Sequence, residues 1–299
     1  MRHDTVALVP QLQPTNAHQL RIGDFVLTTL LDAQMEASFG LVQSIPEEEA
    51  RRLHAENRRP TPPRITLNAF LLDTGDHRIL IDTGIGAFAG EAGAGLMDNL
   101  NAIGLDASAI DTVLLTHMHP DHVGGLIDAD DQPVFPEARV LVPSGELDYW
   151  RSDIPEGAPE VLTKQFQAAH RAIAAFGSRM QRLAGTEVLP GITRVPLPGH
   201  TPDHSGYRIV SGEDRILIWT DIVHLPGIQF PRPEATVAFD VDPAQAAATR
   251  RRIMAELAES RELVAGHHLD FPGIGYVAED GDGFRFCRMF GGLRFKMNS

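Results

Sequence analysis

The stretch Thr116-His117-Met118-His119-Pro120-Asp121-His122 follows directly after the apolar segment 112–115. In an extended backbone, side chains two residues apart point the same way, so His117 and His119 can bind one ion. Pro120 ends the extended run, and a helix or turn opening there would direct Asp121 and His122 toward a second ion nearby. The stretch therefore predicts two neighbouring metal sites that share one short segment.

Two later segments offer further ligands. His200 lies in Gly199-His200-Thr201-Pro202, after the apolar run 195–197, and Asp221 ends the apolar segment 216–220. A carboxylate at the tip of a buried strand is costly unless it is paired or coordinates a metal ion. We therefore expect His200 and Asp221 to join the same site.

The remaining pattern predicts alternating strands and helices. We expect strands at 25–31, 65–72, 78–81, 112–116, 139–142, 206–210, 215–219 and 262–265. We expect helices at 46–59, 96–103, 143–150 and 160–183, and another from Asp242, as N-cap, to about Ser260. This order suggests an α/β protein with two packed sheets and helices on the outer faces. Residues 1–20 would form an N-terminal arm that could pack on a second copy to give a homodimer, and residues 21–299 a single domain.

Composition narrows the function further. The chain of 299 residues carries 26 basic and 40 acidic side chains, a net charge of −14, with no long basic run. This balance argues against nucleic acid as a partner. The single cysteine, Cys287, cannot form an internal disulfide, and no apolar stretch is long enough to cross a membrane. Because the N-terminal segment also lacks the apolar core of a signal peptide, we expect a soluble cytoplasmic protein.

The order of the motifs resembles that of the metallo-β-lactamase superfamily. Asp82-Thr83-Gly84, T-H-x-H-x-D-H-x-G-G from Thr116, G-H-T-P from Gly199, the strand-end Asp221 and a late histidine occur in the family's order. The resemblance implies an αββα sandwich of two mixed β-sheets and two divalent metal ions, usually zinc, with manganese, cobalt or iron as alternatives. By position, the ligands of the first metal would be His117, His119 and His200. Asp121, His122 and the late histidine would hold the second metal, and Asp221 would bridge the two ions.

The late histidine is ambiguous because His267 and His268 are adjacent. The C-terminal half resembles the methyl parathion hydrolase and quorum-quenching lactonase-like branch, in which an L-x-F-P-G run follows the ligand. His268 fits that spacing and is our choice, although Asp270 stands where that branch usually has Pro.

The other site residues are predicted by position and residue type. Asp121 and Asp221 would be catalytic through the ions they hold, and Asp82 and Thr116 would orient ligands. His204 and His224 are expected to hydrogen-bond or to line the pocket rather than to bind metal. The predicted substrate pocket contains Trp150, Phe166, His224, Phe230 and Phe271.

These residues favour a hydrolase. Two divalent ions, two carboxylates and a bridging hydroxide leave a net charge of +1, which favours negative charge developing on a carbonyl or phosphoryl oxygen. We expect the hydroxide to attack a lactone, carboxylic ester or phosphotriester (organophosphate), a small-molecule substrate. A serine hydrolase is disfavoured because no G-x-S-x-G elbow is present and Asp203-His204-Ser205 are consecutive.

Other functions remain open. Among hydrolases, the alternatives are a β-lactamase and a glyoxalase II-like thioesterase, although no C-terminal basic cluster for glutathione is evident. Outside hydrolases, the alternatives are an inactive metal-binding scaffold and a di-iron redox protein, in which a Glu typically replaces the second histidine, here His119.

Overall fold

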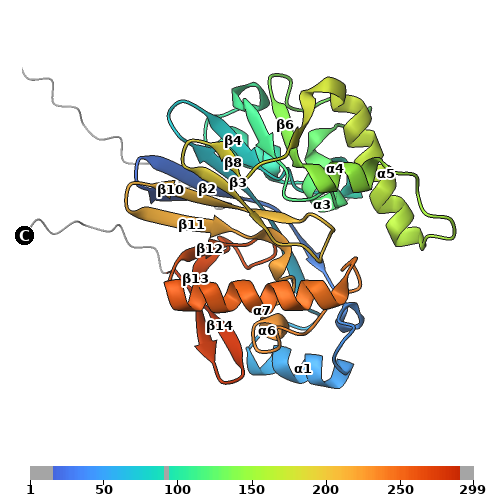
Figure 1. The fold of residues 1–299 in the computed structure, drawn as a ribbon, viewed down its shortest axis with the longest axis vertical. Helices are drawn as coiled ribbons and strands as arrows, with labels where there is room; N and C mark the ends of the chain where they lie inside the picture. Colours follow the sequence, from blue (N-terminus) through green and yellow to red (C-terminus); the bar gives the residue numbers. More distant parts are fainter. Residues whose placement is uncertain (1–15, 91–93, 290–299) are drawn as a thin grey trace, which may run out of the picture.

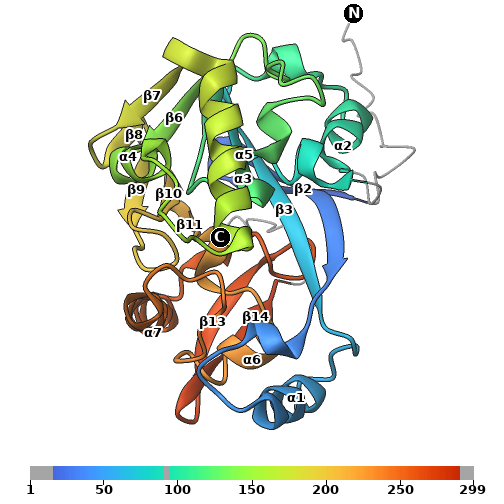
Figure 2. The same ribbon diagram turned by 90° about the vertical axis from the view of Figure 1, so that its right-hand side faces the viewer.

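The computed structural model describes residues 16–90 and 94–289. Within them, two seven-stranded mixed sheets pack face to face, and helices cover the outer faces (Figures 1 and 2). This is the αββα sandwich that the motif order implies. Among the described residues, no helix is both long and apolar enough to cross a bilayer.

Each sheet is formed by one half of the chain. The first sheet contains, in spatial order, β1 (Ala17–Ile22), β2 (Phe25–Glu36), β3 (Arg64–Asp73), β4 (Arg78–Ile81), β5 (Thr112–Leu114), β6 (Arg139–Pro143) and β7 (Met180–Leu183). The second contains β14 (Gly283–Arg288), β13 (Ile274–Asp280), β12 (Leu263–Ala265), β11 (Asp214–Ile218), β10 (Ser205–Ser211), β9 (Ile192–Pro196) and β8 (Glu187–Leu189).

The strands near the middle are buried on both faces, and alternate residues enter different cores. In β3, Phe70 and Leu72 pack between the sheets, whereas Leu71 packs under the helices of the first sheet. In β11, Ile216 lies between the sheets and Leu217 lies under the helix of the second sheet. Because side chains alternate along each strand, the sheets connect three hydrophobic layers: one between the sheets, one under the helices of the first sheet and one under the helix of the second.

The helices divide between the two faces. Residues of α2 (Leu96–Ala102), α4 (Ser144–Arg151) and α5 (Glu160–Phe176) belong to the core of the first sheet, and α7 (Pro243–Ser260) packs on the second. The short helix α3 (Pro120–Val123) begins directly after His119. At one end of the molecule, α1 (Glu47–Glu56) and α6 (Pro226–Gln229) form a smaller cluster (Figure 1).

Among the sequence-based boundaries that differ from the structure, two lie at the edges of the first sheet. The helix expected over 160–183 ends at Phe176, because Gly177 adopts a φ of +51°, and residues 180–183 become the edge strand β7. The expected arm 1–20 overlaps β1, which starts at Ala17 and pairs with β2, so its last residues belong to the sheet. Residues 1–15 of that arm lie outside the described part of the chain.

Strand direction determines where the loops meet. β4 is parallel to β5, and β11 is parallel to β12. β9 and β11 both pair antiparallel with β10 and so run in the same direction. The carboxyl ends of parallel strands meet at one edge of a sheet, which is where sites are built in open α/β sheets. The segments that follow β5, β9, β11 and β12 carry all the predicted metal ligands, and Asp82 follows β4.

Candidate metal centre

The first group of donors consists of His117, His119 and His200, all buried. His119 Nδ1 lies 3.1 Å from His117 Nε2 and 3.0 Å from His200 Nε2. Burial is the main cause that lowers the pKa of His117 and His119 well below the ordinary value, so both imidazoles are neutral and their nitrogens can accept a cation. Three imidazole nitrogens at this spacing form a suitable site for one transition-metal ion.

The second group contains Asp121, His122, His267 and His268. Asp121 Oδ2 lies 3.8 Å from His122 Nε2 and 3.6 Å from the Nε2 atoms of both His267 and His268. Helix α3 begins at Pro120 and carries Asp121 and His122, and the His122 ring lies 3.9 Å from that of His117 between centroids. Both late histidines therefore reach the cluster, including the one that we did not choose.

Asp221 lies between the two groups. Its Oδ1 is 3.2 Å from His122 Nε2, and its Oδ2 is 3.0 Å from His268 Nε2 and 3.4 Å from His200 Nε2. Burial opposes ionisation of Asp221, but the surrounding histidines outweigh it and hold its pKa well below the usual value. An ionised carboxylate that contacts both groups is placed to bridge two ions.

Hydrogen bonds fix the outer nitrogen of four of the imidazoles. His122 Nδ1 lies 2.8 Å from Asp82 Oδ2, and His268 Nδ1 lies 3.0 Å from the Thr66 carbonyl. On the other side, His200 Nδ1 lies 2.8 Å from Asp240 Oδ1, and His117 Nδ1 lies 3.1 Å from Thr116 Oγ1. An acceptor at the outer nitrogen selects the tautomer whose inner lone pair faces the centre. Sequence analysis identified Asp82 and Thr116 but missed Asp240.

Asp82 is itself fixed by hydrogen bonds, in addition to contacting His122. Its Oδ1 accepts from the Thr116 backbone amide at 2.8 Å, and its Oδ2 accepts from Thr116 Oγ1 at 2.7 Å. Its φ of +57° places it in the left-handed region at the end of β4, which Asp tolerates better than most residues. The carboxylate therefore links the end of β4 to the start of the histidine segment.

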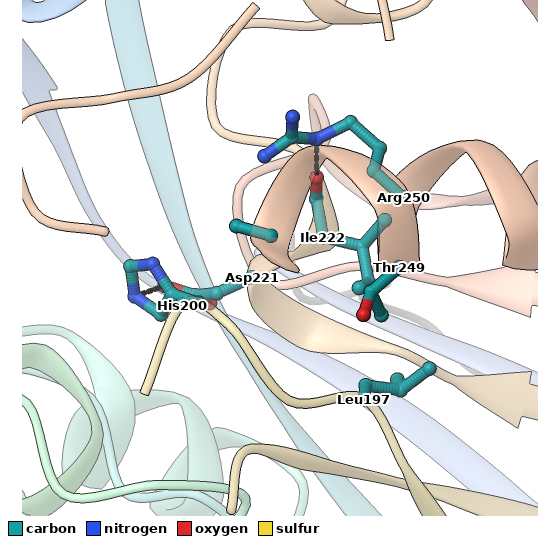
Figure 3. A pocket seen from close by; sticks show the side chains of 7 residues that line it. Leu197, His200, Asp221, Ile222, Thr249 and Arg250 are labelled. Carbon is teal, nitrogen blue, oxygen red and sulfur yellow. Dashed lines mark hydrogen bonds and ion pairs between the residues drawn. The ribbon is translucent and has the colours of Figure 1, made fainter. Parts of the chain in front are cut away.

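Two further residues outside any motif position the ligand loops. Asn68 Nδ2 contacts the carbonyls of Gly266, His267 and Leu269 at 2.7 to 3.3 Å, and so attaches the late-histidine loop to β3. Arg250 of α7, which is 1% exposed, donates at 2.6 Å to the Ile222 carbonyl, directly after Asp221 (Figure 3). No sequence signal marked either residue.

The donor set fits metal cations. His122 Nε2, Asp221 Oδ1 and both nitrogens of His267 are buried with no hydrogen-bond partner among the described residues. Burial favours a neutral His122, but Asp221, Asp82 and Asp121 outweigh it and raise its pKa well above the ordinary value. These carboxylates thus favour positive charge at the centre, which a pair of divalent ions would supply.

A cavity of about 510 Å³ opens onto this cluster, and Asp121, Asp221, His200 and His268 are among the residues that line it. Its walls are mostly apolar and come from segments far apart in the sequence, including Met35, Leu41, Ile65, Leu67, Ile85, Val161 and Phe239. His224 lines the cavity as expected, and its Nε2 lies 3.2 Å from Asp221 Oδ2. His204 instead bonds to the Leu197 carbonyl and Thr220 Oγ1.

The other four predicted pocket residues were wrong. Trp150 and Phe166 are fully buried in the core under the helices of the first sheet, and Phe230 is buried in the core beside α7. Phe271 is half-buried and is absent from the cavity lining. Trp150 does reach the centre indirectly, because its ring packs edge-on to His119 at 5.5 Å between centroids.

Comparison with known proteins gives relatives of the same architecture. The crystal structure of hydrolase AbOPH, described as in the beta lactamase superfamily, is 30% identical and covers 94% of this chain and 100% of its own, with a TM-score of 0.88. AidC, a dizinc quorum-quenching lactonase in complex with a product, is 26% identical, covers 93% and 99%, and has a TM-score of 0.87.

Curated relatives match over a shorter region. The beta-lactamase-like protein 2 homolog of Drosophila melanogaster is 32% identical over 152 residues, which are 48% of this chain and 44% of that protein. A second relative, the uncharacterized protein YobT of Bacillus subtilis, is 28% identical over 144 residues, which are 56% of that protein. The chain thus spans about half the length of the curated relatives it matches. The model of the metallo-beta-lactamase superfamily matches residues 64–267, which hold most of the first sheet and nearly all of the donor residues. With that match extending over more than half of its length, the chain belongs to the metallo-β-lactamase superfamily.

Proposed function

We propose that this chain is a dinuclear metal-dependent hydrolase of lactones and related esters, with phosphotriesters as the second substrate class. The observation that carries the proposal is that residues of two donor groups, with Asp221 between them, line a cavity whose walls are mostly apolar. A scaffold that had lost catalysis would not need to keep both groups complete and facing a cavity.

The residues divide between two ions. His117, His119 and His200 would hold the first ion, Asp121, His122 and His268 the second, and Asp221 would contact both. His268 is our choice of late ligand because its outer nitrogen is hydrogen-bonded to the Thr66 carbonyl, as the outer nitrogens of His117, His122 and His200 are bonded to other groups. When bound, a pair of divalent ions activates water at neutral pH and polarises the oxygen of the bond to be cleaved. We propose zinc, with manganese, cobalt and iron as alternatives.

The cavity walls support the choice of substrate. Met35, Ile65, Val161 and Phe239 offer apolar surface beside the donors, which suits a neutral substrate with an apolar arm. AidC, which is similar over 93% of this chain, is a lactonase whose structure holds N-hexanoyl-L-homoserine as product. A lactone with an acyl arm is therefore our first candidate, and an aryl phosphotriester is the second.

A thioesterase that recognises glutathione is less well supported. Glutathione carries carboxylates, and a pocket for it needs basic side chains. Among the described lining residues, Lys164 is the single Lys or Arg, and its Nζ lies 2.6 Å from Glu160 Oε1 on the same helix. Its charge is thus already paired at the surface.

The test combines metal removal with a substrate panel. Acyl lactones, aryl esters, phosphotriesters, thioesters and β-lactams would be assayed with the metal-loaded chain, the chelated chain and the chain reloaded with zinc, manganese or cobalt. We expect lactone hydrolysis to exceed the other activities, to vanish on chelation and to return with metal. Full activity in the stripped chain would refute a metal-dependent mechanism, and dominant thioester hydrolysis would refute the substrate class.

A further inference from the structure

His267 has no role in the ligand set proposed above, yet its environment is unusual. Its side chain is 0% exposed, and neither ring nitrogen has a hydrogen-bond partner among the described residues. Two other buried histidines differ: both nitrogens of His204 are bonded, and His54 Nε2 lies 2.9 Å from the Pro60 carbonyl. Leaving a buried polar group unsatisfied destabilises the folded protein, so the imidazole of His267 needs a partner.

The position of His267 identifies that partner. Its Nε2 lies 3.6 Å from Asp121 Oδ2, the same separation that His268 Nε2 has, and His122 Nε2 lies 3.8 Å from that oxygen. The rings of His267 and His122 are 4.0 Å apart between centroids and tilted by 32°. Three imidazole nitrogens thus surround one carboxylate oxygen, at nearly equal distances.

These distances fit shared coordination better than hydrogen bonding. A separation of 3.6 Å exceeds the range of about 2.7–3.2 Å for an N–H···O hydrogen bond. Two donors bound to one ion at about 2.1 Å in tetrahedral geometry lie about 3.4 Å apart. The distance of 3.6 Å from Asp121 Oδ2 to His267 Nε2 is therefore close to the distance between two ligand atoms of one ion. The same holds for the distance from Asp121 Oδ2 to His268 Nε2.

We propose that His267 is an additional protein ligand of the second metal ion. This inference rests on the paired-metal function proposed above. The second site then has Asp121, His122, His267 and His268 as its own donors plus the shared Asp221, whereas the first has three histidines plus Asp221. A four-donor first site suits tetrahedral zinc, and a five-donor second site suits an ion that accepts five or six ligands, such as manganese, iron or cobalt.

Cobalt binding to the full chain tests the assignment without measuring activity. The stripped chain and its His267→Ala, His267→Gln and His54→Ala variants would be titrated with Co²⁺ against a competing chelator, with visible absorption recorded at each step. We expect two ions per wild-type chain, one of them with the weak absorption of a highly coordinated ion. In His267→Ala, one site should lose at least tenfold in affinity and gain absorption intensity as its coordination number falls. His54→Ala, which removes a buried histidine outside the donor groups, should retain both affinities.

The outcomes separate the two proposals. If the wild-type chain binds no pair of ions, the proposed function fails. If it binds two and His267→Ala leaves both affinities and the spectrum unchanged, the proposed function stands and His267 is not a ligand. The Gln variant keeps an N–H donor for Asp121 but is a weak ligand, so restored affinity in His267→Gln would mean a hydrogen-bonding role and would overturn the inference. Should the Ala variant fail to fold, a lower affinity with an altered spectrum in His267→Gln would support it.

Discussion

Replacing Asp82 with Asn tests how the end of β4 supports the metal centre. Asn tolerates the left-handed backbone at this position, where φ is +57°, so the substitution leaves the turn intact. The Asp carboxylate accepts hydrogen bonds at both oxygens, whereas the Asn amide accepts at one oxygen and donates from its NH₂ group. If the Asn oxygen keeps the Thr116 amide, its NH₂ group faces the Nδ1 of His122, which needs an acceptor.

The expected size of the effect follows from these contacts. Loss of the acceptor 2.8 Å from His122 Nδ1 leaves a buried donor unsatisfied, which costs about 1–3 kcal/mol of the free energy of unfolding. The preferred tautomer of His122 is also lost, and removal of such an outer partner lowers metal affinity about 10- to 100-fold. That range corresponds to about 1.4–2.7 kcal/mol of binding free energy, similar to the folding term.

Two measurements separate folding from metal binding. Urea unfolding of the stripped chain reports the stability term, and chelator competition reports the affinity of each ion. Asp240→Asn is the matched control, because Asp240 Oδ1 lies 2.8 Å from His200 Nδ1 on the other side of the centre. We expect Asp82→Asn to weaken the site of His122 and Asp240→Asn to weaken the site of His200. Unchanged affinities in Asp82→Asn, or equal weakening of both sites by either variant, would refute this division.

Two further predictions concern the cavity and the loop that carries His200. Phe239→Ala removes part of the cavity wall, so it should raise KM severalfold for substrates with an apolar arm while the metal content stays unchanged. Phe230→Ala is the comparison, because Phe230 lies in the core: it should lower the free energy of unfolding by about 3–5 kcal/mol without altering substrate preference. Burial raises the pKa of Glu146, which accepts from Trp150 and Asp203, so its contribution to stability should be complete below about pH 4.3 and fall as pH rises through the raised pKa. Urea unfolding of the stripped chain should show this fall at no more than about 1.4 kcal/mol per pH unit, and a Glu146→Gln variant that retains the same slope would contradict it.

Part of the donor cluster could be predicted because its geometry is local. His117 and His119 are two residues apart, so their side chains point the same way on an extended backbone, and Pro120 starts the short helix that carries Asp121 and His122. Eight of the fourteen strands in the described residues were expected for the same reason, since periodicity is a local property. The six that were not expected are β1, β7, β8, β9, β13 and β14. The helix expected over 160–183 shows where this local reasoning fails. Residues 180–183 form an edge strand because they pair with β6, and the composition of the segment, which is typical of a helix, gives no sign of that pairing.

The cavity could not be predicted because its walls come from distant elements. Aromatic residues were chosen for the pocket on residue type, yet Trp150 and Phe166 are core residues, and the walls use ordinary apolar residues such as Met35 and Val161. Which face of a helix meets solvent depends on its tertiary partners. The contact of Asp240 with His200 could not be predicted for a related reason, because the two residues are 40 positions apart and no local pattern links them.

The pair His267 and His268 shows why spacing alone could not identify the late ligand. In an extended strand, adjacent side chains point to opposite faces, so a sequence argument expects one of the two to enter the site. The structure places both in a turn between β12 and β13, where Asn68 contacts the carbonyls of Gly266, His267 and Leu269. This curvature lets both imidazoles approach Asp121 Oδ2 at 3.6 Å. Spacing alone therefore could not choose between the two histidines, because both approach the centre in this loop, which the side-chain amide of Asn68 attaches to β3.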